Sequence, residues 1–106
     1  MINLTFEKYD VVVLSSEQWD RYDDNIDIEV RIKEGCRYAA TLFTIQNLAS
    51  LLEKHRKSGE CANGTFVWAV EMIVLRDLNV ESIFAMVEDL ISTGEIHTAM
   101  LKIMDS

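Results

Sequence analysis

The feature that most constrains the fold is a strict alternation of apolar and charged residues at positions 26–33. The apolar and charged members alternate as Ile26, Asp27, Ile28, Glu29, Val30, Arg31, Ile32 and Lys33. Because successive side chains of a strand point to opposite faces, this period of two predicts a strand with one buried and one polar face. Glu34-Gly35 supplies a turn, and residues 36–43 return as a second strand. Residues 26–43 therefore predict an antiparallel hairpin.

Two further segments are predicted to be extended. Residues 4–14 include the run Val11-Val12-Val13, and β-branched residues favour strands. Residues 66–75 are apolar except for Glu71. A nearly continuous apolar run is typical of a central strand covered on both faces. We expect Phe66, Trp68 and the other residues of that face to belong to the core.

Two helices are predicted from apolar stripes at helical spacing and from their end residues. The first begins after Thr44, whose hydroxyl can cap a helix, and ends at Gly59. The second begins after Asn79 and ends at Gly94. The stripe of the first helix is Ile45, Leu48, Leu51, Leu52 and His55, and that of the second is Ile83, Met86, Val87, Leu90 and Ile91.

The order of these elements predicts an α+β fold. Residues 96–104 suit either a last strand or a helix. We expect residues 1–106 to form a single two-layer domain, in which two helices pack on a mostly antiparallel sheet of about five strands.

Charge indicates the kind of partner. The chain has 18 acidic residues against 10 Lys and Arg, a formal net charge of -8. Such a surface repels phosphate backbones and anionic lipid, so neither nucleic acid nor a membrane is expected as a partner, whereas a basic protein is favoured. The chain has no apolar run of spanning length and no signal-like start, which predicts a cytoplasmic protein with Cys36 and Cys61 reduced.

The acidity is concentrated in residues 17–29, where six acids and one base give a net charge of -5. Two aromatic residues lie among these acids. Aromatic side chains are common anchors of protein interfaces, and carboxylates steer basic partners. The predicted partner-binding residues are Trp19, Asp20, Tyr22, Asp23, Asp24, Asp27 and Glu29.

No catalytic, cofactor or metal site is predicted. Glu71 is a lone acid in an apolar run, and the pair His55 and Cys61 lies at a helix end that disfavours a thiolate. His97 has no metal-ligand spacing to a cysteine or to His55. The alternatives are a small enzyme or ligand-binding domain that uses a cleft near residues 58–71, and a homodimeric structural protein.

Several segments also resemble small uncharacterised bacterial proteins of similar length. The resemblance covers the hairpin 26–43, the helix that begins at Thr44-Ile45, and the segments 58–60, 64–69 and 72–78. In size, acidity and α+β layout, the chain is similar to bacterial immunity proteins that neutralise toxins. The resemblance implies a non-enzymatic protein-binding module, an immunity protein that binds and occludes a basic toxin domain.

Overall fold

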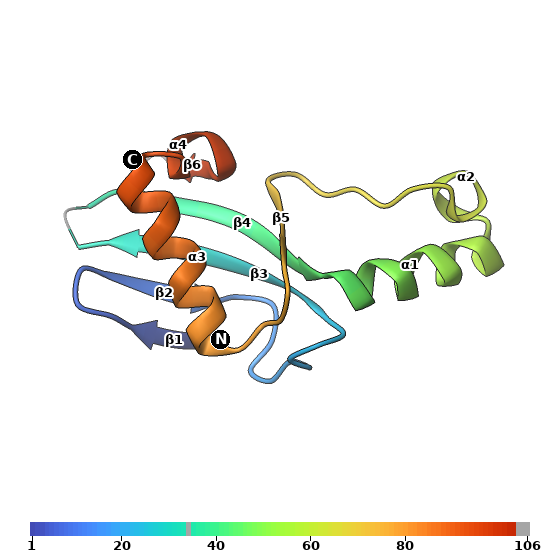
Figure 1. Ribbon diagram of the computed structural model, residues 1–106, viewed down its shortest axis with the longest axis horizontal. Helices are drawn as coiled ribbons and strands as arrows, with labels where there is room; N and C mark the ends of the chain where they lie inside the picture. The colour runs from blue at the N-terminus through green and yellow to red at the C-terminus, as the bar shows by residue number, and fades with distance from the viewer. Residues whose placement is uncertain (34, 104–106) are drawn as a thin grey trace.

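A computed structural model describes residues 1–33 and 35–103 and has the predicted α+β architecture (Figure 1). The strands are β1 (Ile2–Thr5), β2 (Tyr9–Val13), β3 (Asn25–Ile32), β4 (Arg37–Thr44), β5 (Met72–Leu75) and β6 (Leu101–Ile103). The helices are α1 (Ile45–Ser58), α2 (Glu60–Gly64), α3 (Val80–Thr93) and α4 (Ile96–Ala99).

All strands belong to one mostly antiparallel sheet. β1, β2, β3 and β4 follow one another as antiparallel neighbours, and the hairpin of β3 and β4 confirms the strongest sequence prediction. Two strands share the far edge of β4: β6 pairs antiparallel with Arg37 to Ala39, and β5 pairs parallel with Thr41 to Thr44.

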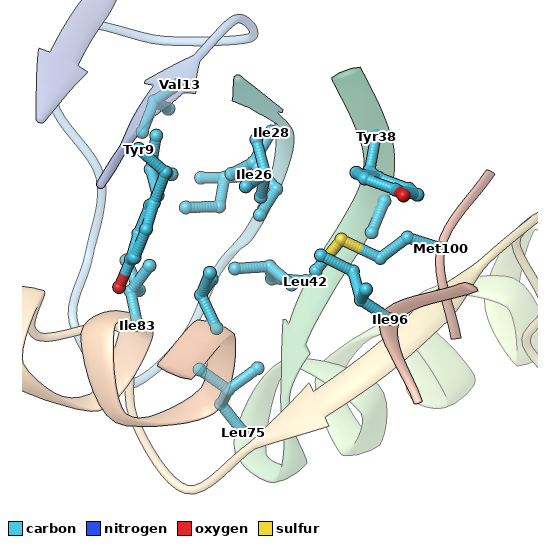
Figure 2. Packing of buried hydrophobic residues seen from close by; sticks show 14 of the residues in the cluster. Tyr9, Val13, Ile26, Ile28, Tyr38, Leu42, Leu75, Ile83, Ile96 and Met100 are labelled. Atoms are coloured by element: carbon cyan, nitrogen blue, oxygen red, sulfur yellow. The ribbon is translucent and has the colours of Figure 1, made fainter. Parts of the chain in front are cut away.

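The hydrophobic core lies between one face of this sheet and α3 (Figure 2). Each of β2, β3 and β4 contributes alternate residues, as the period of two predicts. From α3, Ile83 and Val87 are buried against the sheet, with Leu78 just before the helix and Met100 after α4. The sheet residues of this core are Tyr9, Val11, Val13, Ile26, Ile28, Val30, Tyr38, Ala40, Leu42 and Leu75.

Helix α1 is placed differently from α3. It meets the sheet at its first turn, where the Thr44 hydroxyl accepts a hydrogen bond from the Asn47 N–H. It then extends away from the sheet together with α2 (Figure 1). Asn47 is its one buried residue, whereas Ile45 is exposed and the rest of the predicted stripe is half-buried. We call α1, α2 and residues 65–71 the arm, and residues 65–71 within it the strap.

Three segments have a different secondary structure from the one predicted. Residues 4–14 form two strands, because the chain turns at residues 6–8, where the Phe6 N–H donates to the Tyr9 carbonyl. Residues 96–103 form α4 and then β6, so both predicted forms occur, and residue 104 lies outside the described residues. Of residues 66–75, the last four alone form a strand.

The shortness of β5 has a physical reason in β4. The first half of the β4 edge is occupied by β6, so four residues of that edge, Thr41 to Thr44, pair with β5. Glu71 interrupts the extended run with a positive φ of 51°, while its carbonyl accepts from the Thr41 N–H. The strap is thereby displaced from the core, and the prediction that Phe66 and Trp68 are buried is wrong.

Candidate functional site

The acidic segment 17–29 does not form one charged face. Its loop residues are held by their own carboxylates: Asp20 Oδ1 accepts from the N–H groups of Tyr22 and Asp23, at 2.8 and 3.0 Å. These two hydrogen bonds hold the pKa of Asp20 below its usual range. Asp24 accepts from the N–H groups of Asp20 and Asn25. Asp20 and Asp24 therefore shape the loop.

Asp23 connects this loop to the arm. Its two carboxylate oxygens accept from Asn47 Nδ2 and Ser50 Oγ, each at 3.2 Å. Asn47 Oδ1 in turn accepts from Asn25 Nδ2 at 2.9 Å. A carboxylate beside the first turn of a helix also interacts favourably with the positive end of its dipole. The acidic loop thus anchors the start of α1.

Asp27 and Glu29 belong to β3 and lie on the second face of the sheet, opposite α3. Glu29 is 7% exposed and forms ion pairs with Arg31 at 2.8 Å and Arg37 at 3.2 Å. Its charge is neutralised within the sheet, so the prediction that Glu29 steers a partner is not supported by its position. Asp27 is exposed, and its Oδ1 accepts from the Thr41 hydroxyl at 2.8 Å.

The two predicted aromatic anchors also differ. Trp19 is half-buried, packs against the core and donates its indole N–H to the Leu78 carbonyl at 2.9 Å. The Arg21 guanidinium lies over the same ring, 5.0 Å from its centroid. Tyr22 is 58% exposed. Trp19 therefore ties the acidic loop to the body of the protein, and Tyr22 remains accessible to a partner.

Asp27 and Glu71 line one hollow of about 410 Å³ on the second face. The sequence did not predict this pairing, because it depends on the register of β4 with β5. Ala39 and Thr41 of β4 have small side chains, which leave space between the neighbouring strands. The lining is Leu14, Ser15, Asp27, Ile28, Ala39, Ala40, Thr41, Val70, Glu71 and Leu101, with two carboxylates and no basic residue.

Exposed apolar side chains surround this hollow and continue along the strap. Leu14, Val70 and Leu101 line the hollow and are exposed. On the strap, Trp68 is 68% exposed two residues before Val70. Trp68 was predicted to belong to the core, whereas it lies at the surface. The one feature of the sequence that could have indicated an exposed segment here was Glu71, a charged residue within the apolar run.

The His and Cys residues that were considered for catalysis do not line this hollow. His55 and Cys61 belong to the arm and do not line the hollow, and Cys36 and Cys61 are both free thiols. His97 lies outside the arm, in α4, and its Nδ1 is 3.0 Å from the Tyr38 hydroxyl. Of the described residues that line the hollow, none is a His, Lys or Cys, and the Thr41 hydroxyl donates to the Asp27 carboxylate. Among residues 1–33 and 35–103, no three potential ligands are grouped for a metal.

Within the same described ranges, every helix is too short or too polar to cross a membrane. Comparison with protein-family models, curated proteins and solved structures found no match to the chain.

Proposed function

We propose that the protein is a binding module for a basic protein, and that the hollow of Asp27 and Glu71 receives a Lys or Arg side chain of that partner. One observation supports this most directly: the hollow has two carboxylates, no basic residue and an exposed apolar rim. The methylene stem of a Lys or Arg packs on apolar side chains while its charged end binds carboxylates. A net charge of -8 favours encounter with the same class of partner.

The strap supplies the apolar part of the proposed interface. Trp68 is the most exposed aromatic residue of the described chain. Tryptophan is enriched among the few residues that contribute most of the free energy of binding. Tyr22 and Asp20, on the acidic loop, would add a polar rim whose charge acts mainly on the association rate.

A basic toxin domain has the surface chemistry that this site requires. We therefore retain the proposal, made from the sequence, that the chain is a bacterial immunity protein that occludes such a domain. Co-expression with a candidate toxin tests it: growth should be rescued by the wild-type chain and lost when Trp68 is changed to Ser. Equal rescue by both chains would contradict a role for the strap.

Direct binding tests the wider proposal. A partner captured on the immobilised chain would be purified and its Kd measured by calorimetry at two salt concentrations. Asp27→Asn/Glu71→Gln should weaken binding by at least about tenfold at low salt. Trp68→Ser should weaken it by about 30-fold, as expected for an interface residue worth about 2 kcal/mol.

The matched control is Asp89→Asn/Glu95→Gln, which removes the same charge from exposed positions outside the hollow. This control should change Kd by less than about threefold, because exposed charges outside an interface contribute little. If the control weakens binding as much as the change in the hollow, the partner responds to net charge and the proposed site is wrong.

A further inference from the structure

A second hollow, of about 450 Å³, lies at the opposite end of β2 and β3 from the first. It is formed by the turn between β1 and β2, the end of β3, and the second half of α3. Its lining residues are Glu7, Lys8, Tyr9, Ile32, Lys33, Glu88 and Ile91, none of which lines the hollow of Asp27 and Glu71. Its volume falls within the range of about 300–1,000 Å³ that small-molecule sites occupy.

Tyr9 lines this hollow and has a buried hydroxyl without a hydrogen-bond partner among the described residues. Tyr9 is 1% exposed, and its hydroxyl is buried without a hydrogen bond to any described residue. The ring packs against Phe6 and Phe84, with centroids 5.2 and 6.4 Å away. In Figure 2 the ring extends from β2 toward α3, with its oxygen beside Ile83. Buried hydroxyls are normally hydrogen-bonded, so this one is a candidate to donate to a ligand.

Burial and the nearby Glu88 carboxylate raise the pKa of Tyr9 to about 12. The raised value has a clear physical cause, because both a low dielectric and a neighbouring negative charge disfavour the phenolate. The hydroxyl therefore keeps its proton throughout the neutral range and is available as a donor.

Among the described residues that line the hollow, positive and negative charges are equal in number. Lys8 and Lys33 provide two cations, and Glu7 and Glu88 provide two carboxylates. Ile32 and Ile91 add half-buried apolar surface. A simple anion would be repelled by the two carboxylates and a simple cation by the two lysines. A molecule that has both an ammonium and a carboxylate can pair with both signs.

We propose that this second hollow binds a zwitterionic ligand of amino-acid or dipeptide size with an apolar side chain. The ligand's carboxylate pairs with Lys8 and Lys33 and accepts the hydrogen bond of Tyr9, and its ammonium pairs with Glu88. Its apolar side chain packs on Ile32 and Ile91. Because the Tyr9 hydroxyl is covered in this structure, its hydrogen bond to the ligand requires the groups that cover it to move.

The test is an NMR titration of the full chain with L-leucine, L-phenylalanine and the dipeptide Leu-Leu. At least one of these probes should give saturable shifts of the Tyr9 amide and of the Ile32 and Ile91 methyl groups. Two capped molecules serve as matched controls: N-acetyl-leucine lacks the ammonium and leucinamide lacks the carboxylate. Each should bind at least about tenfold more weakly than its zwitterion, because it loses a charge-assisted interaction.

Variants of the lining residues locate the site. Tyr9→Phe removes the hydroxyl and should weaken binding several-fold. Lys8→Gln/Lys33→Gln changes two exposed side chains, so the fold should be retained. It should weaken binding about tenfold or more. Lys54→Gln/Lys57→Gln, which removes two exposed lysines from the arm, should leave binding unchanged. Absence of saturable shifts with all three probes, or equal binding of capped and zwitterionic probes, would overturn the proposal.

Discussion

The body and the arm of this protein are held together by different forces. In the body, the sheet and α3 enclose a continuous apolar core. In the arm, α1 buries Asn47 alone, and polar contacts fix its first turn: the cap from Thr44 and the hydrogen bonds of Asn47 and Ser50 to Asp23. Helices α1 and α3 are both 14 residues long and both end at a left-handed glycine. Helices of equal length and similar C-terminal residues are therefore buried unequally, and α3 is the more apolar of the two.

This difference separates stability from recognition. Burial of apolar area is the largest favourable contribution to folding, and it is concentrated in the body. The arm leaves apolar residues such as Trp68 and Val70 at the surface, where they are available to a partner. A region that contributes less to folding can present such residues without a loss of global stability.

The largest expected effect comes from changing a leucine to alanine in the body, compared with the same change in the arm. Leu42→Ala, at a position in β4 with no exposed area, should lower the free energy of unfolding by about 3 kcal/mol. Leu52→Ala, at a half-buried position in α1, should lower it by about 1 kcal/mol or less. Urea unfolding followed by circular dichroism measures both values. Similar losses in the two variants would mean that the arm is part of the same core.

The second comparison concerns two glycines with positive φ. A Cβ on Gly64 would overlap the Leu52 carbonyl oxygen and lie 2.7 Å from the Arg56 backbone nitrogen. Gly64→Ala should therefore separate α2 from α1 and destabilise the arm by about 2 kcal/mol. Amide hydrogen exchange should show lost protection in residues 52–64 and unchanged protection in β2, β3 and β4.

Gly94→Ala is the matched control for this substitution. Its φ of 80° is close to the 79° of Gly64, but a Cβ there meets no described atom within 4 Å. It should cost about 1 kcal/mol from backbone conformation alone. If Gly64→Ala costs no more than Gly94→Ala, the close approach of α2 to α1 does not stabilise the arm.

Local sequence signals predicted the individual helices and strands better than their positions in the fold. The alternation in residues 26–33 and the end residues Thr44, Gly59 and Gly94 act within a few positions, and the structure confirms them. The turn at residues 6–8 has no Gly or Pro, so the division of the first segment was missed. The position of the strap depends on which strand occupies the edge of β4, and no local pattern states that.

The candidate site was predictable to a smaller extent. Asp27 was predicted as a partner-binding residue and does line the hollow, whereas Glu29 is buried in ion pairs. The role of Glu71 depends on the parallel register that places Met72 opposite Thr41. Contacts between positions so distant in the chain are fixed by tertiary packing, so charge and aromatic composition alone could not distinguish structural acids from accessible ones.

A third and smaller effect distinguishes the two tryptophans. Trp19→Phe removes the indole N–H that donates to the Leu78 carbonyl, and should lower the free energy of unfolding by about 1 kcal/mol. Trp68→Phe changes an exposed ring and should stay within about 0.5 kcal/mol of the wild type. Thermal unfolding measures both. A larger loss for Trp68→Phe than for Trp19→Phe would mean that the strap is structural.

The smallest effect concerns pH and the first turns of α3 and α1. Asp77 accepts from the Ser82 hydroxyl at 2.6 Å and from the Asn79 N–H at 3.0 Å, and these hydrogen bonds hold its pKa below the usual range. A carboxyl with a lower pKa in the folded state stabilises the fold fully above its unfolded pKa, about 3.9. That stabilisation is lost as pH falls through the lower folded value. At the start of α1, the capping group is the hydroxyl of Thr44, which does not titrate there.

Hydrogen exchange between pH 5 and pH 2 should therefore show the first turn of α3 losing protection as the carboxyl is protonated. Asp77→Asn removes the titrating group, so this pH dependence should become weaker in α3 and stay the same in α1. The first turn of α1 is also held by a carboxylate, that of Asp23, so it is the effect of Asp77→Asn on α3 that isolates the contacts of Asp77 from those of other acids. An unchanged pH dependence of the first turn of α3 in Asp77→Asn would show that the Asp77 carboxylate does not stabilise that turn.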